Sequence, residues 1–348
     1  MPGKQPKTVM KAASATIAKK AASLVVTKGK LTGRVMDSPV LKAQARTRAA
    51  LQKKYDELGG AATFGAPPPK KFGGRWGFPH QSLVYNAKQG AAYLVKGAIL
   101  DKRLSLGAEK SYLGRPTSDE GDIDEGGRAS SFQNGWIYWW GDTGAIDLRD
   151  VVVTYVGLHA YSESDKDQSS GSDEPYCILS VVAPKRDLVT LRSQTYEGVD
   201  DRTVRPDRVE LYRGPAYGLT VGVVAMEGDF GSAEANRILV ERAVMTNHEV
   251  GKFMLQFIPL VGPIISKIAG PALDKVMPPL ANGIASVLDL GDDIVGTDSV
   301  ALSTRKLVTL ATRGSVYRAA NKLPYKVESA MMEGGGARYK ALFTVDPA

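Results

Sequence analysis

The sequence predicts an α+β fold, with a small repeat module followed by an antiparallel β-sandwich that carries an inserted helical segment. A motif rich in glycine and aromatic residues occurs twice within residues 55–148. Short runs of β-branched residues, separated by turns, then fill much of 151–348 and are typical of antiparallel sandwiches. An apolar stretch at about 232–291 interrupts these runs, and its repeated prolines would divide it into short helices.

Residues 1–54 form a strongly basic arm, which we expect to be partly helical or disordered. They contain 13 lysines or arginines and one acid, Asp37, a net charge of +12, whereas the whole chain carries +8. The rest of the chain therefore sums to −4, and the basic character belongs to the arm. Such an arm can bind an acidic partner or a secretion apparatus. Nucleic acid is a less favoured partner, for which the affinity would fall steeply with salt.

Neither a secretory signal peptide nor a membrane span is predicted. Lysines interrupt every apolar run of the arm, and the longest uncharged apolar run, 253–266, has 14 residues and contains two prolines. A signal peptide requires an apolar stretch of ~7–15 residues, and a membrane-spanning helix about 18 or more. We therefore expect a protein that reaches the cell surface or the extracellular space without a cleavable signal peptide, or one that is cytoplasmic before delivery.

Each copy of the repeat predicts a helix end, a turn and a hairpin. Leu-Gly pairs at 58–59 and 106–107 are typical of helix C-termini at which glycine adopts a left-handed conformation. A Gly-x-Pro turn follows each pair, and the aromatic run 136–140 predicts a strand that enters a tight hairpin. A helix at about 96–106 should join the copies, and the second copy is about five residues longer, within 119–124.

The second copy resembles the LGFP repeat of actinobacterial cell-surface and cell-wall-attached proteins. The resemblance rests on Leu113-Gly114-Arg115-Pro116, Asp119-Glu120, Gly127-Arg128, Phe132, the run 135–139 and Gly144-Ala145. The first copy is degenerate, with Phe-Gly-Ala-Pro at 64–67. The resemblance implies binding to a cell-envelope glycan or peptidoglycan, with four aromatic side chains in a sugar-stacking groove: Trp76, Tyr138, Trp139 and Trp140. The alternative is that these rings form the packed core of the repeat.

The second half of the chain alternates predicted strands with acidic loops. The predicted strands are 151–156, 176–182, 188–191, 209–212, 219–224 and 306–310. Loops at one end of a sandwich would bring their carboxylates together. Crowded carboxylates repel unless a cation lies between them, and an oxygen-only cluster suits Ca²⁺. An ordinary acidic loop surface is the alternative.

These acidic segments resemble the calcium loops of synaptotagmin-type, calcium-dependent phospholipid-binding sandwiches, known as C-two domains. Segment 167–176 is similar to the first calcium loop, and 221–231 together with 292–303 to the third. The resemblance implies Ca²⁺ as a cofactor, a phospholipid membrane as a partner, and five calcium ligands: Asp167, Asp173, Glu227, Asp229 and Asp293. The segment 232–291 departs from the family. It either caps the sandwich as extra core or forms amphipathic helices at a membrane.

Together these patterns favour a non-enzymatic binding protein that attaches to a cell-envelope glycan and binds Ca²⁺, with a membrane as a further partner. The chain has no nucleophile elbow, phosphate-binding loop, zinc-protease motif or dinucleotide fingerprint. A hydrolase acting on glycan or peptidoglycan stays open, because Glu120, Asp142 and Glu227 are available as acid and base, although nothing pairs them. The competing class is a toxin or effector, delivered by a bacterial secretion or injection system, whose apolar insert perturbs a target membrane.

Overall fold

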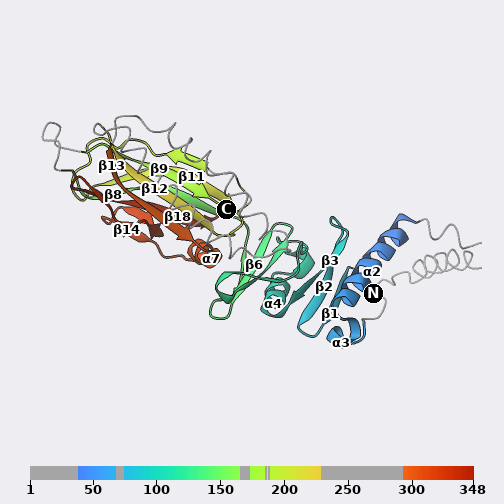
Figure 1. The fold of residues 1–348 in the computed structure, drawn as a ribbon. Coiled ribbons are helices and arrows are strands. Elements are labelled where there is room, and N and C mark those ends of the chain that lie inside the picture. The colour runs from blue at the N-terminus through green and yellow to red at the C-terminus, as the bar shows by residue number, and fades with distance from the viewer. Residues whose placement is uncertain (1–37, 68–73, 165–172, 185, 187–188, 229–292) are drawn as a thin grey trace, which may run out of the picture.

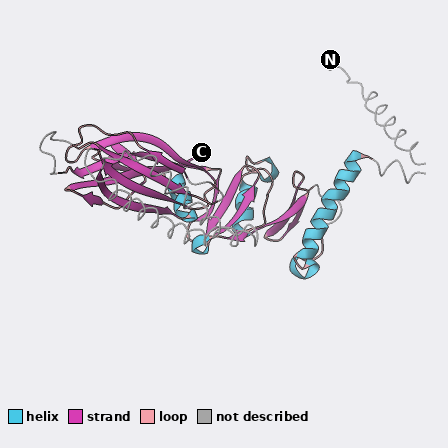
Figure 2. Cartoon of the chain, turned by 45° about the horizontal axis from the view of Figure 1, so that its top comes forward, coloured by secondary structure: helices cyan, strands magenta, loops and turns pink. Residues whose placement is uncertain are grey.

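A computed structural model describes residues 38–67, 74–164, 173–184, 186, 189–228 and 293–348. The described chain is elongated, and two small repeat units and a larger β-sandwich follow one another along its length (Figure 1, Figure 2). Helix α2 lies at one end and the sandwich at the other. The fold is α+β, as predicted.

The first repeat packs two helices on a three-stranded antiparallel sheet of order β1-β2-β3. Its elements are α2 (Pro39–Glu57), α3 (Gly60–Phe64), β1 (Arg75–Phe78), β2 (Gln81–Asn86) and β3 (Ala91–Lys96). α2 begins inside the predicted basic arm with a proline at its first position, where the missing N–H has no helical partner to lose. Residues 1–37 of the arm lie outside the described residues. The core of this repeat contains Leu51, Tyr55, Phe64, Trp76 and Leu83.

The second repeat follows the same plan, with a sheet of order β4-β5-β6-β7. Its elements are α4 (Gly97–Ser105), η1 (Ala108–Lys110), β4 (Gly121–Asp122), η2 (Asp124–Gly126), β5 (Arg128–Phe132), β6 (Gly135–Trp140) and β7 (Gly144–Leu148). Both predicted helix ends are confirmed. Gly59 and Gly107 follow α2 and α4 with φ angles of 98° and 96°, a region in which other residues are strained. β4 and η2 lie at the insertion predicted in this copy.

The described residues within 151–348 form a sandwich of two antiparallel sheets, of order β10-β9-β12-β13 and β11-β8-β18-β16, with β17 paired to β18 and a separate hairpin of β14 and β15. The strands are β8 (Val151–Ser162), β9 (Pro175–Val182), β10 (Val189–Arg192), β11 (Val204–Gly214), β12 (Leu219–Glu227), β13 (Asp293–Leu302), β14 (Tyr317–Ala319), β15 (Leu323–Tyr325), β16 (Val327–Glu328), β17 (Met332–Gly334) and β18 (Ala337–Pro347). Tyr155 and Phe343 of one sheet share a buried cluster with Cys177, Leu179 and Val223 of the other. The two sheets therefore enclose one core.

One predicted strand is wrong, because residues 306–310 lie in helix α7 (Thr304–Thr312). Ser303 caps this helix, since its Oγ accepts a hydrogen bond of 3.1 Å from the backbone N–H of Lys306. Apolar side chains recur at helical spacing and face the core: Leu307, Val308, Leu310 and Ala311. The cap and this spacing outweigh the β-branched content on which the strand prediction was based.

The hydrophobic core continues from the second repeat into the sandwich. Trp136, Tyr138 and Trp140 of β6 belong to the same buried cluster as Tyr155 of β8 and the apolar face of α7. At the expected domain boundary, 148–151, the chain therefore passes from the second repeat into the sandwich without a break in the hydrophobic core.

The helical insert predicted at about 232–291 lies outside the described residues. The strands on either side of it are adjacent, because β12 and β13 pair directly and Glu227 lies opposite Asp293 at the end of the ladder. No helix in the described part of the chain combines the length and the hydropathy that crossing a bilayer requires.

Candidate functional site

The aromatic strand β6 presents its side chains alternately to the two faces of its sheet. Trp136, Tyr138 and Trp140 share one face, with successive ring centroids 6.0 and 6.2 Å apart and ring planes within 22° of each other. Trp136 also meets the ring of Tyr217 edge-on at 5.2 Å. All three β6 rings are buried, so they form the core that joins the second repeat to the sandwich.

Trp139 lies on the opposite face of β6 and is half-buried. It packs against the apolar cluster between the two repeats and lines a cavity of about 480 Å³. The cavity forms where the turn between β1 and β2 meets the start of α4, and Glu120 and Arg128 complete its wall. Its volume falls within the ~300–1,000 Å³ typical of small-molecule sites.

Arg128 and Glu120 give this cavity its polar character. Arg128 lies opposite Trp139 in the β5–β6 ladder, so the two side chains share a face. The Nε of Arg128 donates to Oε1 of Glu120, and its Nη1 lies 3.0 Å from Oδ1 of Asp122. The side chain of Glu120 is 5% exposed, and its Oε2 is buried without a hydrogen-bond partner among the described residues. The lining of the cavity therefore includes an indole ring, a guanidinium group and Glu120.

Polar contacts between the two repeats hold the wall of the cavity in place. Asp119 accepts a hydrogen bond of 2.8 Å from the backbone N–H of Leu94 and forms an ion pair with Lys54 of α2. Nη1 of Arg115 donates to the backbone carbonyl of Tyr85 at 2.8 Å. Each contact joins one repeat to the other, so together they fix the segment that carries the carboxylate of the cavity.

Trp76, the fourth residue predicted for a sugar groove, belongs to the core of the first repeat. It is 7% exposed, and its ring meets that of Tyr55 edge-on at 5.8 Å. Of the four predicted aromatic residues, the described structure places Trp139 at the cavity and the other three in packed cores.

Two of the predicted calcium ligands, Asp173 and Glu227, meet at one end of the sandwich. The hydroxyl of Tyr339 lies between them, donating to Oδ2 of Asp173 and lying 3.1 Å from Oε2 of Glu227. Oδ2 of Asp173 also accepts from the backbone N–H of Ser164 at 2.7 Å, and Oε1 of Glu227 from that of Glu174. Burial raises the pKa of the Glu227 carboxyl to about 7, and the nearby charge of Asp173 adds to this effect.

The other three predicted ligands fall at or beyond the edges of the described residues. Asp167 and Asp229 lie outside the described residues, and Asp293 opens β13 opposite Glu227. Within the described ranges, no three histidine, cysteine, aspartate or glutamate side chains gather into a group that could hold a metal ion. Asp173 and Glu227 supply oxygen ligands of the kind that Ca²⁺ prefers, but two carboxylates fall short of the 6–8 ligands of a calcium site.

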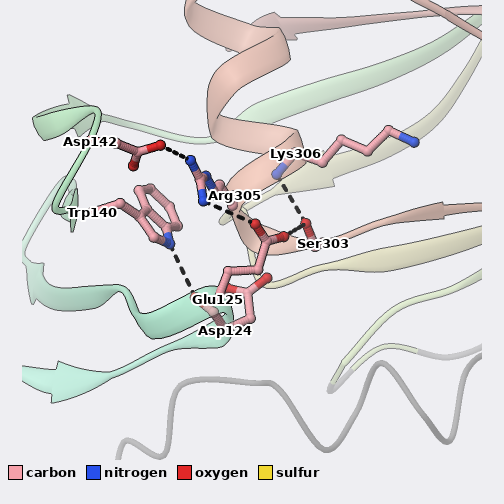
Figure 3. Close-up of polar contacts among 7 residues, drawn as sticks. All are labelled: Asp124, Glu125, Trp140, Asp142, Ser303, Arg305 and Lys306. Atoms are coloured by element: carbon pink, nitrogen blue, oxygen red, sulfur yellow. Dashed lines mark hydrogen bonds and ion pairs between the residues drawn. The ribbon is translucent and has the colours of Figure 1, made fainter.

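The second repeat docks on the sandwich through the start of α7 (Figure 3). Arg305 forms ion pairs with Glu125, at 3.3 Å, and with Asp142. The hydroxyl of Ser303, which caps α7, donates to Oε1 of Glu125 at 2.9 Å. Glu125 of η2 thus contacts both Ser303, which caps α7, and Arg305 in the first turn of α7.

Asp124, beside Glu125, is buried in the same interface (Figure 3). Its backbone carbonyl accepts a hydrogen bond of 3.1 Å from Nε1 of Trp140. Burial raises the pKa of the Asp124 carboxyl to about 6, the charge of Glu125 raises it further, and a hydrogen bond from the backbone N–H of Arg305 opposes the shift. The carboxyl therefore faces the N-terminus of α7, where the helix dipole favours negative charge.

As site residues, sequence reasoning named Glu120 only as a candidate acid or base for glycan hydrolysis and did not name Arg128, although both stand within the repeat motif and line the cavity. Strand alternation along 136–140 contains the signal that separates Trp139 from the residues on either side. Glu120 and His80 of the first repeat line the same cavity because of how the two repeats pack, and no local sequence pattern predicts this.

Residues 113–154 match the family model of the LGFP repeat. The match begins at Leu113, after η1, and ends in the first residues of β8, and it confirms the resemblance predicted for this copy. No protein of curated function matches the chain. The LGFP repeat suggests a cell-surface-associated binding role for the protein.

Proposed function

We propose that the protein attaches to a cell-envelope glycan or peptidoglycan through its repeat module and performs no chemistry on it. The observation that carries this proposal is the position of Trp139, which lies within the LGFP-matching segment and lines the cavity between the repeats. A sugar ring presents apolar C–H groups on its faces and hydroxyls around its edge. An indole offers a large, rigid apolar surface for the C–H groups of the sugar face. The polar side chains beside it can form hydrogen bonds with the hydroxyls.

Co-sedimentation with purified cell-envelope glycan and peptidoglycan tests this proposal. Trp139→Ala removes the ring from the cavity, and we expect it to lower the affinity about fivefold or more, since tryptophan is enriched among the interface residues whose truncation costs more than about 1 kcal/mol. Tyr317→Ala is the matched control, because Tyr317 is an aromatic residue of the sandwich that is 57% exposed. Sedimentation of Trp139→Ala to the same extent as the unaltered protein would contradict the proposal.

We also propose a calcium site at the acidic end of the sandwich, formed by Asp167, Asp173, Glu227, Asp229 and Asp293, with a phospholipid surface as its partner. The contact of Asp173 and Glu227 through Tyr339 supports it, as does the position of Asp293 opposite Glu227. A bound cation would supply the positive charge that lets neighbouring carboxylates stay ionised together.

Thermal unfolding with Ca²⁺, with Mg²⁺ and with a chelator tests the calcium site. At ~100 times its dissociation constant, a ligand stabilises the folded state by about 2.7 kcal/mol, which shifts the midpoint by several degrees. Asp173→Asn should abolish the Ca²⁺-dependent shift, whereas Glu210→Gln, which alters an exposed carboxylate on β11, should keep it. No shift with Ca²⁺ in the unaltered protein would exclude the site.

A further inference from the structure

We propose that the cavity between the repeats takes an acidic sugar, and that Lys96 and Arg128 select it by pairing with its carboxylate or phosphate group. This inference rests on the proposed glycan-binding function and adds the chemical class of the sugar and the residues that recognise it. Three observations carry it: the balance of charge in the cavity wall, the available donors of the two cations, and the indole ring of Trp139 in the same wall.

The first observation concerns the charge of the cavity wall. Two side chains of this wall are cations, Lys96 and Arg128, and one is an anion, Glu120. Glu120 is ion-paired with Arg128, so its charge is already balanced within the wall and the charge of Lys96 is left over. Asp122 also pairs with Arg128, but its side chain is 84% exposed and does not line the cavity, so solvent screens its charge. The wall therefore presents an excess of positive charge to a ligand.

The second observation concerns donors that a ligand can reach. Lys96 is partly exposed and forms no ion pair within the described part of the chain. The side chain of Arg128 is 34% exposed, and its Nη2 donates a hydrogen bond to no described residue, whereas its Nε and Nη1 contact Glu120 and Asp122. Ammonium and guanidinium groups only donate hydrogen bonds, and they bind carboxylate and phosphate oxygens most strongly. Both cations can therefore contact an acidic group while their present contacts stay in place.

The first turn of α4 adds to the positive potential of the cavity. Gly97, Ala98 and Ile99 line the cavity beside Lys96, and this turn contains no acidic side chain. The N-terminal end of a helix carries a partial positive charge, which favours an anion nearby. The helix end thus strengthens a preference that the two cationic side chains establish.

The third observation concerns shape. Trp139 and Arg128 occupy opposite positions of the β5–β6 ladder, so the indole and the guanidinium-bearing side chain lie on the same side of the sheet. A sugar ring packed on the indole would therefore carry the substituents of its edge toward Arg128. The indole itself accepts neutral and acidic rings alike, because it contacts their C–H faces. The cations therefore decide which class of sugar is preferred.

Calorimetric titration of the full chain tests the inference with three tetrasaccharides of equal length, built from a neutral N-acetylhexosamine, from a uronic acid and from a sugar phosphate. We expect at least one acidic tetrasaccharide to bind about threefold or more tightly than the neutral one, and added salt to narrow this difference. The acidic tetrasaccharide that binds more tightly identifies the group, carboxylate or phosphate, that the two cations recognise.

Variants of Lys96 test its role in this preference. Lys96→Gln should weaken binding of the acidic sugar about three- to fivefold, as expected for a partly exposed ion pair, and leave binding of the neutral sugar unchanged. Lys96→Arg keeps the charge and should keep the preference. Lys88→Gln is the matched control, because Lys88 is exposed in the β2–β3 turn, at the opposite end of the hairpin from Lys96, and it should bind as the unaltered protein does.

The outcomes separate this inference from the proposed function. If the neutral sugar binds as tightly as both acidic ones, or if Lys96→Gln keeps the full acidic preference, the inference is overturned while glycan binding that depends on Trp139 stands. Binding of none of the three tetrasaccharides also overturns the inference. Envelope co-sedimentation that does not depend on Trp139 overturns the proposed function itself.

Discussion

Glu125 and Arg305 lie 180 residues apart in the chain, yet they form an ion pair in which Oε2 and Nη1 are separated by 3.3 Å. Glu125 belongs to η2 of the second repeat, and Arg305 to the first turn of α7 in the sandwich. Beneath this pair the two parts share one buried cluster, which includes Trp140. The repeat and the sandwich are therefore joined by both apolar and ionic contacts, and we expect them to unfold together.

Arg305→Ala should weaken this junction. The substitution removes ion pairs to Glu125 and Asp142, each partly exposed, so we expect a loss of about 0.5–1 kcal/mol in the free energy of unfolding, measured in urea. Arg213→Ala is the control, because the pair of Arg213 with Glu210 lies within a single strand. If Arg305→Ala unfolds at the same urea concentration as the unaltered protein, the ionic part of the junction contributes nothing to stability.

Gly127→Ala should disturb the packing beneath the junction. A Cβ at this position would lie 2.7 Å from Cε2 of Trp140 and 2.8 Å from Cγ1 of Ile123, both in the buried core. Because overpacking a core costs typically 1–3 kcal/mol, we expect a clearly lowered melting temperature. At Gly141 no atom lies within 4 Å of the added Cβ, so Gly141→Ala should change stability little. Equal melting temperatures for the two variants would contradict this packing.

Asp124 should make stability depend on pH. Its folded-state pKa of about 6 exceeds the ordinary 3.8, so the folded protein holds this proton more tightly than the unfolded chain does. The stabilising contribution is complete below about pH 4 and is lost as the pH rises through 6. Asp124→Asn cannot ionise, so its stability relative to the unaltered protein should rise by about 1–2 kcal/mol between pH 4 and pH 7.

The control for this titration is Asp142→Asn, because the side chain of Asp142 is 65% exposed. Denaturant melts at several pH values should show the pH-dependent gain for Asp124→Asn and not for Asp142→Asn. Parallel pH profiles for Asp124→Asn and the unaltered protein would show that this carboxyl does not titrate near pH 6.

Cys177, the single cysteine of the chain, should be inert in the folded protein. It lies fully buried on β9, and burial raises the pKa of its thiol to about 12, so almost no thiolate is present at neutral pH. Iodoacetamide at pH 8, followed by mass spectrometry, should leave native protein unlabelled and modify unfolded protein once per chain. Rapid labelling of the native protein would mean that β9 is open to solvent.

The repeat was predictable from sequence because its signals are local. A left-handed glycine after a helix and an aromatic strand before a hairpin are decided by neighbouring residues, and both Gly59 and the β6–β7 hairpin are found as predicted. The roles of the β6 rings were not predictable in the same way. Alternation can separate Trp139 from Trp140, but it does not tell which face meets the sandwich and which borders a cavity.

At the acidic end of the sandwich, prediction from the sequence was limited for a different reason. The resemblance to calcium loops implied that Asp173 and Glu227 belong together, and the structure brings them to one hydroxyl, that of Tyr339. Tyr339 was not predicted there, because it arrives on β18, 112 residues after Glu227, through the pairing of β18 with β8. Partners brought together by sheet topology leave no mark in local spacing.

Hydrogen–deuterium exchange of the full chain, with and without cell-envelope glycan, tests the central claim most directly, because it reports where the ligand lies. If the glycan binds in the cavity, exchange should slow in the segments that line it, which include Gln81, Ala98, Glu120 and Arg128. Exchange at the exposed hairpin of β14 and β15 should not change. Binding that protects this hairpin, or any other surface, while leaving the cavity segments unchanged would contradict the account.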